Sequence, residues 1–387
     1  MPPTITSVEA FAFTYDREHV RSQTVGPLVY AEGETAELTG YAVRIDTDSG
    51  VTGEFVGGTA SGHAQIAEVA PYLVGENPLD RERHWSELKR ALRATDRMGL
   101  GPLDIALWDL AGERYDAPVH ELLGTYRDRL PAYASTYFGD ADAAGLDTPA
   151  AYADYAEACR DAGFPAFKVH PVEGGDVDRD VATVHAVADA VGDDLDLMLD
   201  PVCGYGTFAE ALAVGRACDE CGFYWYEDPY RDAGTSAHGH GALRDRLDTP
   251  LLQAEMIRGV EAHTDFVDAG ATDFVRADPV WDGGITGAMK IARVAEGHGL
   301  DVEYHLAGPH TRHCMAATRN ANYYELGLVG PEASVPHSEP PVYDSYTDGV
   351  DALDGDGTVP VPDGPGLGVD YDWAYIEDNA TDVVVAE

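Results

Sequence analysis

Short apolar runs recur through the middle of the chain, and most of them end in an ionisable residue. Continuous apolar runs of this length are typical of parallel strands that are buried on both faces. Ionisable groups at the ends of buried strands cost free energy unless other groups pair with them, so several in the same register predict one shared pocket. The runs are AFKVH, which contains Lys168 and His170, DLDLMLD ending at Asp200, GFYWYE at Glu227, PLLQAE at Glu255, DFVRAD at Asp278 and LDVEYH at His305.

The spacing of these residues predicts the architecture. From Lys168 to Glu325, the strand-end residues follow one another at intervals of 20–32 residues, the length that one strand, one crossover helix and two loops need. The segments between them, such as TFAEALAVGRACDECG, have apolar residues at helical spacing and end in glycine. Counting LPAYAST as the first strand and NYYELGLV as the last gives eight. We therefore predict an α/β fold in which residues 126–330 form a (β/α)7β barrel of the TIM type, with the active site at its strand ends.

The regions on either side of the barrel predict a capping domain. Residues 1–125 begin with ITSVEAFAFTY and TGYAVRIDTDSGVTGEFVGG, which indicate antiparallel strands joined by a turn at residues 47–50, and continue with helical segments. Residues 331–387 are rich in Gly, Pro and Asp, but Val, Tyr and Trp are interspersed. We expect this tail to return to the first region and to complete an α+β module with it.

The charge balance narrows the possible functions. The chain has 69 acidic and 25 basic residues, a formal net charge of −44. Phosphate binding needs a basic surface, so a nucleic-acid partner is not expected. Because the acids are spread along the whole chain, we interpret them as the surface of a protein from a high-salt organism, where ions screen the repulsion.

Several absences lead us to expect a cytoplasmic protein. No apolar run approaches the ~20 residues of a membrane span, and we expect no membrane partner. The N-terminus lacks the pattern of a signal peptide. The five cysteines are odd in number and show no disulfide pattern, which suits a reducing compartment.

Three consecutive strand ends carry the acids Asp200, Glu227 and Glu255, and together they predict a metal site. Mg²⁺ prefers hard oxygen ligands, whereas zinc more often recruits histidine or cysteine. Each acid alone could be a solvated residue at a strand end. Three in succession favour one Mg²⁺ per active site, with Lys168 as the cation that lets a substrate carboxylate approach.

The other strand-end residues predict proton chemistry. Asp278 and His305 end neighbouring strands, and a carboxylate beside a histidine fixes its tautomer and raises its basicity. Lys168 and His170 lie two residues apart on one strand and point to the same face. A nearby cation can lower the pKa of a lysine and allow acid–base work. His170 is either a base or a hydrogen-bonded core histidine.

In its order and spacing this set of residues resembles that of the enolase superfamily, specifically the mandelate racemase subgroup. The resemblance extends over nearly the full chain, from DIALWDLAGERYDAPVHELLG through the run FKVH to NYYELG and on to DGPGLGVDYDW. It implies the following roles: Mg²⁺ ligands for Asp200, Glu227 and Glu255, a His–Asp dyad for Asp278 and His305, the first lysine of a Lys-x-Lys motif for Lys168, and an acid that hydrogen-bonds the substrate carboxylate for Glu325.

The resemblance also implies a reaction. Members abstract the proton α to a carboxylate and form a metal-stabilised enediolate, and here Lys168 and a protonated Glu325 would add stabilisation. We expect a lyase that dehydrates an acid sugar, an aldonate or aldarate, to a 2-keto-3-deoxy acid, with His305 or His170 taking the first proton. A racemase or epimerase of a 2-hydroxy acid is the alternative on the same scaffold. A non-catalytic protein that binds sugar acids or metal is the alternative from another class.

Two departures from the subgroup pattern and one contrast with other members refine this expectation. The second lysine of the motif is His170, which argues against a racemase that uses a lysine on one face. Pro201 and Val202 replace an Ala-Asn pair, so one hydrogen bond behind the metal ligands is expected to be missing. Asp278 stands where muconate-lactonising members carry lysine, which argues against cycloisomerase or dipeptide-epimerase chemistry.

Substrate contacts are expected from loops of the capping domain, at about residues 16–32 and 55–62. The candidates are His19, Arg21, Tyr30 and, at the end of the first barrel strand, Tyr137. The expected partner is a small acid sugar, and we expect a homo-oligomer.

Overall fold

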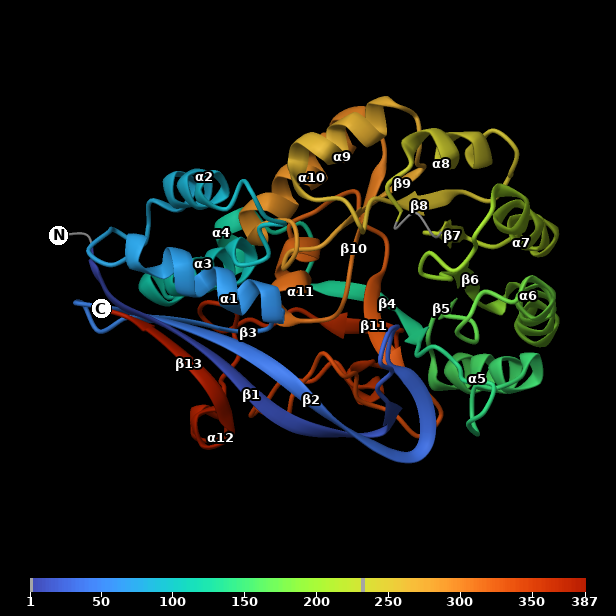
Figure 1. The fold of residues 1–387 in the computed structure, drawn as a ribbon, viewed down its shortest axis with the longest axis horizontal. Helices are drawn as coiled ribbons and strands as arrows, with labels where there is room; N and C mark the ends of the chain where they lie inside the picture. The colour runs from blue at the N-terminus through green and yellow to red at the C-terminus, as the bar shows by residue number, and fades with distance from the viewer. Residues whose placement is uncertain (1–2, 231–233) are drawn as a thin grey trace.

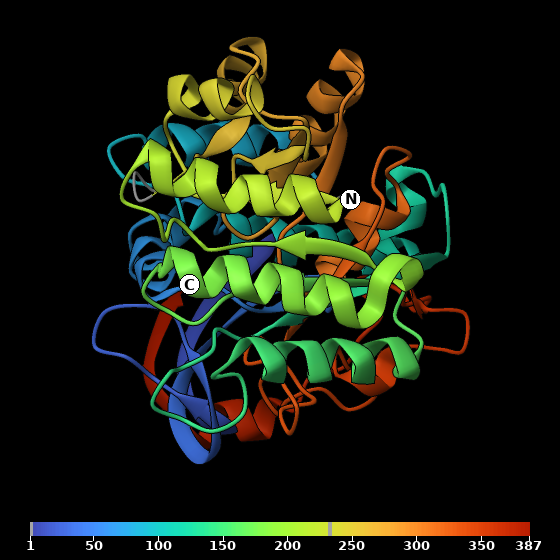
Figure 2. The ribbon, with the colours of Figure 1, turned by 90° about the vertical axis from the view of Figure 1, so that its right-hand side faces the viewer.

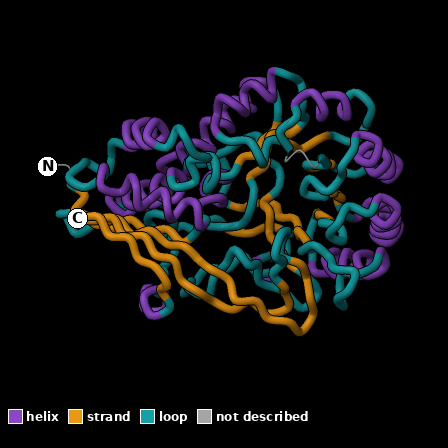
Figure 3. Tube along the Cα trace, in the orientation of Figure 1, coloured by secondary structure: helices purple, strands orange, loops and turns teal. Residues whose placement is uncertain are grey.

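A barrel and a capping domain beside it make up the structure, a computed structural model that describes residues 3–230 and 234–387 (Figure 1). The capping sheet lies on the side where both termini are found, and the barrel helices lie on the opposite side. In Figure 3 the strands of the capping sheet run side by side as long tubes toward the barrel.

Eight parallel strands alternate with seven helices in the described part of the barrel. Each strand from β4 to β10 pairs in parallel with its neighbours, and β11 pairs with β4. Beyond the end of β10, the amide of Leu306 donates to Glu325 on β11 at 3.0 Å, which links the two ends of this order. The predicted (β/α)7β barrel is thereby confirmed. The elements are β4 (Arg129–Thr136), α5 (Pro149–Ala162), β5 (Ala166–Val169), α6 (Val177–Val191), β6 (Asp196–Leu199), α7 (Phe208–Cys221), β7 (Trp225–Glu227), α8 (Ala237–Arg244), β8 (Leu251–Gln253), α9 (Gly259–Asp268), β9 (Phe274–Ala277), α10 (Gly284–His298), β10 (Asp301–Tyr304), α11 (Pro309–Ala316) and β11 (Tyr324–Val329).

The barrel helices are placed by local signals that the sequence carries. The α7 helix begins with a capping box between Thr207 and Glu210 and ends at Gly222, which adopts the left-handed conformation (φ 70°). Its buried face turns inward, as does that of α6, where Val184 and Val187 are fully buried. Figure 2 shows α5, α6 and α7 stacked side by side over the outside of the sheet.

The barrel interior has an apolar layer directly below a charged layer. Tyr133, Ala166, Met198, Trp225 and Leu252 form one buried cluster. Burying each of the larger side chains contributes about 1.5–3 kcal/mol. Because side chains two residues apart share a face of a strand, the next inward positions belong to another set: Ser135, Lys168, Asp200 and Glu227. The alternation that packs the core therefore also delivers the ionisable residues to the open end.

The capping domain is built on a four-stranded antiparallel sheet of order β13-β1-β2-β3. The long β1–β2 hairpin reaches the barrel, where the amide of Tyr30 donates to the carbonyl oxygen of Phe138 at 2.8 Å. The predicted turn between β2 and β3 contains Gly50 with φ 79°. The elements are β1 (Ile5–Arg21), β2 (Val29–Thr47), β3 (Thr52–Val56), α1 (Ala60–Val69), α2 (Arg81–Ala91), α3 (Leu100–Tyr115) and α4 (Val119–Leu123).

The C-terminal tail connects the two units. Its strand β12 (Thr358–Pro360) pairs antiparallel with β4 of the barrel, and β13 (Ala380–Ala386) pairs antiparallel with β1 of the cap. Helix α12 (Trp373–Asp378) lies between them in the chain. The prediction that the tail completes the capping domain is confirmed. In the described residues, no helix combines the length and the apolar character needed to cross a bilayer.

Candidate active site

Asp200, Glu227 and Glu255 meet at the open end of the barrel. They come from the ends of β6, β7 and β8, and one carboxylate oxygen of each lies within 4.8 Å of those of the other two. All three side chains are buried. Three convergent carboxylates form a site for a hard divalent cation.

The backbone at these strand ends adopts conformations that L-residues usually avoid. Positive φ angles occur at Val202 (41°), Cys203 (59°), Asp228 (32°), Ala254 (95°) and Leu306 (61°). Each costs on the order of 1–3 kcal/mol and persists only where surrounding contacts impose it. All five lie within three residues of an inward-pointing acid or histidine, so the strain accompanies the sharp turns that aim these side chains.

Two permanent cations lie among the carboxylates. Lys168 Nζ contacts Asp200 Oδ2 at 3.2 Å, Glu227 Oε2 at 3.1 Å and Glu325 Oε1 at 2.9 Å. Burial lowers the pKa of Lys168, but Glu227 and Glu325 raise it more, to well above its ordinary value. The carboxylates around Lys168 therefore favour its charged form, and its part in proton transfer stays a prediction.

Arg276 is the second cation, and the sequence reasoning missed it. Its Nε lies 2.8 Å from Glu227 Oε1 and its Nη2 lies 2.9 Å from Glu325 Oε2. The side chain is fully buried. Arg276 stands two residues before Asp278 in DFVRAD, so strand alternation already placed it on the inward face.

The surroundings of Glu325 favour its ionised form, whereas the resemblance implies a protonated acid. It accepts hydrogen bonds from Ser135 Oγ (3.0 Å) and the amide of Leu306 (3.0 Å), besides its contacts to Lys168 and Arg276. Burial raises its pKa, but Lys168 and Arg276 hold the pKa of Glu325 well below its usual value. Four donors thus surround this carboxylate, and its predicted hydrogen bond to a substrate stays a prediction.

Asp278 and His305 form a hydrogen-bonded pair. Asp278 Oδ2 lies 2.6 Å from His305 Nδ1, while Oδ1 accepts from the amides of Val280 (2.7 Å) and Trp281 (2.9 Å). The opposite ring nitrogen, Nε2, lies 3.5 Å from Glu255 Oε1. Burial lowers the pKa of His305, but Glu255 and Asp278 raise it more, to about 9. The pair therefore directs a strongly basic nitrogen toward the carboxylate cluster.

His170 is held at both ring nitrogens. Its Nδ1 donates to the carbonyl oxygen of Thr136 at 2.6 Å, and its Nε2 lies 3.1 Å from Asp200 Oδ2. The ring also packs at 4.8 Å from that of Phe138. These contacts fix the imidazole behind Asp200. The amide of Val202 donates to Asp200 Oδ1 at 2.9 Å, so the backbone supplies a bond to this carboxylate where a side-chain bond was expected to be missing.

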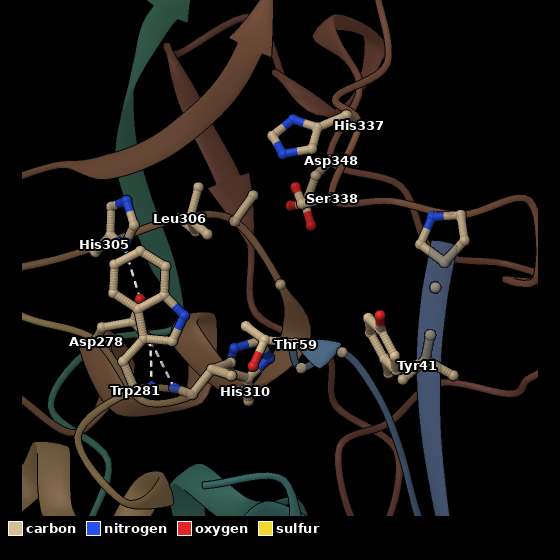
Figure 4. A pocket seen from close by; sticks show the side chains of 18 of the residues that line it. Tyr41, Thr59, Asp278, Trp281, His305, Leu306, His310, His337, Ser338 and Asp348 are labelled. Atoms are coloured by element: carbon tan, nitrogen blue, oxygen red, sulfur yellow. Dashed lines mark hydrogen bonds and ion pairs between the residues drawn. The ribbon is translucent and has the colours of Figure 1, made fainter. Parts of the chain in front are cut away.

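A cavity of about 260 Å³ opens beside the dyad (Figure 4). Asp278 and His305 line it from the barrel, and Tyr41 and Thr59 line it from the capping domain. In Figure 4, His305 and Asp278 lie on one side of the open space and Tyr41 lies across from them. The cavity is thus formed where the two units meet.

The comparisons with known proteins agree with this arrangement. Residues 14–124 match the mandelate racemase / muconate lactonizing enzyme N-terminal domain, and residues 151–375 match the enolase C-terminal domain-like family. The chain belongs to the mandelate racemase/muconate lactonizing enzyme family. It is an enzyme of the enolase superfamily, and its fold and site geometry can be compared with those of named members.

Three known proteins that are similar to this chain have different activities in their names. The structure of D-glucarate dehydratase from Agrobacterium tumefaciens complexed with magnesium is 33% identical, covers 98% of this chain and 99% of that chain, and has a TM-score of 0.88. D-galactarolactone cycloisomerase of Agrobacterium fabrum is 29% identical over 85% of this chain and 88% of the relative. L-rhamnonate dehydratase of Saccharopolyspora erythraea is 28% identical over 84% of this chain and 82% of the relative. One family scaffold thus carries several activities.

The residues at the metal site fit the hard divalent cation that family membership implies. Burial raises the pKa of Glu227 to about 8. Burial, with Glu255 and Glu227 next in effect, raises the pKa of Asp228 well above its ordinary value, and both oxygens of Asp228 are buried without a hydrogen-bond partner among the described residues. Negative charge is therefore in excess despite Lys168 and Arg276. A bound divalent cation would offset this excess.

The four residues expected to contact the substrate do not line the cavity. His19 Nδ1 accepts from the amide of Gly33 at 3.2 Å, and Arg21 pairs with Glu34 and Asp140. The Tyr30 hydroxyl accepts from the amide of Glu332 at 3.2 Å, and Tyr137 is fully buried, its ring 6.0 Å from that of His337. Most of the expected loop 16–32 is strand, which directs these side chains elsewhere. The expected loop 55–62 does contribute, through Val56, Gly57, Gly58 and Thr59.

The C-terminal tail supplies a wall of the cavity that sequence reasoning did not foresee. His337, Ser338, Pro340, Tyr343 and Asp348 line it together with Trp281 and His310 of the barrel. His337 and Ser338 lie more than 30 residues beyond His305, in a segment without a regular pattern. Their position soon after the last barrel strand is the one sequence signal that could have indicated them.

Proposed function

We propose that this enzyme is a Mg²⁺-dependent lyase that dehydrates an acid sugar to a 2-keto-3-deoxy acid. The proposal rests on one observation above others: the Asp278–His305 pair aims its free nitrogen at the cluster of Asp200, Glu227 and Glu255, with Nε2 3.5 Å from Glu255 Oε1. A base and a cation site that share one substrate suit removal of a proton α to a carboxylate.

The first step is assigned to His305. The Nδ1–H group of the ring donates a hydrogen bond to Asp278. The other nitrogen, Nε2, therefore carries the lone pair that takes the proton from C2 of the substrate. A bound Mg²⁺, held by Asp200, Glu227 and Glu255, would supply positive charge at the substrate carboxylate as negative charge develops there. Lys168 adds a fixed positive charge to the same region because its pKa stays high.

The second step uses the proton that His305 has gained. Protonated Nε2 is an acid within the same cavity and can donate to the 3-hydroxyl group as its bond to C3 breaks, which releases water. The C2–C3 enol that remains tautomerises to the 2-keto acid. Asp278 stabilises the imidazolium between the two transfers, so one residue serves as base and then as acid.

Arg276 and Glu325 hold neighbouring charged side chains in place in this scheme. Their ion pair keeps Glu325 anionic, and the carboxylate in turn fixes Lys168 at 2.9 Å. We assign these residues a positioning role toward Lys168 and Glu227. His170 is assigned a similar role toward Asp200, because both of its ring nitrogens already have partners.

The test is a screen of an acid-sugar library with Mg²⁺ in high-salt buffer, with the 2-keto acid product as the readout. His305→Asn is expected to abolish turnover while leaving Mg²⁺ binding, measured by calorimetry, unchanged. His298→Asn is the matched control, because that histidine lies at the surface on α10. Absence of keto acid from every aldonate and aldarate would refute the proposal.

Epimerisation is the second candidate on this scaffold. It would share the first step and end with return of a proton to C2. The fixed position of His170 disfavours it, because a second base on the opposite face would have to leave Thr136 or Asp200. Solvent deuterium entering C2 of recovered substrate, without loss of water, would identify an epimerase. Tight binding of an acid sugar without turnover or exchange would identify a non-catalytic protein.

A further inference from the structure

The cavity wall across from His305 is polar but carries no permanent positive charge. Among the described residues that line the cavity, none is a lysine or an arginine. The two acids that line it are Asp278 and Asp348. The other polar side chains are uncharged or imidazole, and they include Tyr41, Thr59, His310, His337 and Ser338.

Three polar atoms of this wall are buried and have no hydrogen-bond partner among the described residues. They are His310 Nδ1, His337 Nδ1 and Ser338 Oγ. Buried polar atoms normally find partners, so an unpaired set around one cavity indicates a polar ligand. Burial lowers the pKa of His310 to about 4 and, together with Arg17, that of His337 to about 4. At neutral pH both rings therefore offer one donor and one acceptor without charge.

The nearby arginines are engaged elsewhere. Arg312 Nη2 lies 2.6 Å from Asp348 Oδ1, and the same carboxylate accepts from the hydroxyls of Tyr324 and Tyr346. Arg17 does not line the cavity; its Nη2 donates to the carbonyl oxygen of Glu339, and its guanidinium lies 5.9 Å from the ring centre of Tyr15. Arg312 is ion-paired with Asp348, and neither Arg312 nor Arg17 is among the residues that line the cavity.

We infer that this wall, defined by Tyr41, Thr59, His310, His337 and Ser338, is a neutral hydroxyl-binding subsite, and that the substrate is an aldonate rather than an aldarate. The inference rests on the proposed dehydratase function and specifies its substrate class. The single carboxylate lies at the cation site, and the hydroxylated chain extends past His305 to the wall. A second carboxylate at the far end would be desolvated near Asp348, with no lysine or arginine among the described lining residues to pair it.

The decisive comparison uses pairs of substrates that differ only at the terminal carbon. Gluconate is compared with glucarate and galactonate with galactarate, each with Mg²⁺ in high salt. For at least one pair, the aldonate is expected to exceed its aldarate in kcat/KM by about 100-fold or more. Equal rates, or faster dehydration of the aldarates, would overturn the inference and leave the dehydratase function standing. If no acid sugar is turned over, the proposed function fails, and the affinities of the same pairs, measured calorimetrically, still decide the charge preference of the wall.

Two variants test the wall itself. Ser338→Arg places a cation in the cavity and is expected to shift the aldonate-to-aldarate ratio toward the aldarate by about tenfold or more, whereas Ser338→Gln, of similar length but neutral, is expected not to. His337→Phe keeps a ring but removes the nitrogen atoms that would hydrogen-bond a substrate hydroxyl. It is expected to lower kcat/KM for the aldonate by about tenfold. An unchanged ratio in a folded Ser338→Arg protein, checked by circular dichroism, would contradict the placement of Ser338.

Discussion

At the scale of single residues, the behaviour of His305 depends on what each of its ring nitrogens faces. Asp278 at 2.6 Å and Glu255 at 3.5 Å both stabilise the imidazolium, and together they outweigh burial and raise the pKa to about 9. The folded-state pKa lies above the ordinary value of 6.5. Protonation therefore stabilises the fold fully below pH 6.5, and this contribution is lost as the pH rises through 9.

The corresponding prediction concerns the titration of His305. In the metal-free protein, NMR of the imidazole is expected to give a pKa near 9, and Asp278→Asn is expected to lower it because one stabilising partner is lost. Because only the neutral ring can accept a proton, activity is expected to rise with pH. Mg²⁺ bound beside Glu255 is expected to shift this rise in activity to lower pH. A pKa close to 6.5 in the metal-free protein would show that the two carboxylates do not act on the ring.

At the scale of elements, the barrel strands are tied together at their open ends by charged side chains as well as by backbone ladders. Arg276 on β9 reaches Glu227 on β7 and Glu325 on β11, and Lys168 on β5 reaches Asp200 beyond β6. Each partner is buried, so the loss of one leaves an uncompensated charge in a medium of low polarity. This network joins strands that are not neighbours in the sheet.

Arg276→Met is expected to be much more destabilising than loss of a surface arginine. It leaves Glu227 and Glu325 short of a buried partner, and the expected loss in the free energy of unfolding is about 3–5 kcal/mol. Arg90→Met is the control, because Arg90 pairs with Glu87 on the exposed face of α2, and its expected cost is below about 1 kcal/mol. Denaturant unfolding in high salt measures both, and similar values for the two variants would rule out the network as a source of stability.

At the scale of the whole molecule, the charge of −44 acts on stability without any single contact. Like charges repel one another in the compact state more than in the expanded chain, and dissolved ions reduce this repulsion. The high-salt habitat remains a prediction from the sequence. It has a consequence that can be measured on the purified protein.

The melting temperature is expected to rise as KCl is increased from about 0.1 M to about 3 M, because the screening length shrinks from ~10 Å to a few ångströms. Calorimetry or circular dichroism measures the change. Sucrose of matched osmolality serves as the control, because it is excluded from the protein surface but screens no charge. A melting temperature that is independent of KCl would contradict the interpretation of the acidic surface.

The positions of the strand-end residues were predictable from the sequence, for a local reason. A parallel barrel places every strand end at one rim, and alternation along each strand selects the inward positions, so Asp200, Glu227 and Glu255 could be expected to converge before any coordinates were known. Arg276 follows from the same rule, because it lies two residues before Asp278 in DFVRAD and therefore on the same face of the strand.

Ionisation states and cavity walls were decided by the tertiary structure. Glu325 is anionic because Arg276, Lys168, Ser135 and Leu306, distant in sequence, donate to it at once. His337 and Ser338 meet Tyr41 only because the tail folds back between barrel and cap. The order and facing of strand residues follow from periodicity, which is a property of short segments. The charge of a buried group and the shape of a cavity are sums over neighbours from the whole chain, and no local pattern contains them.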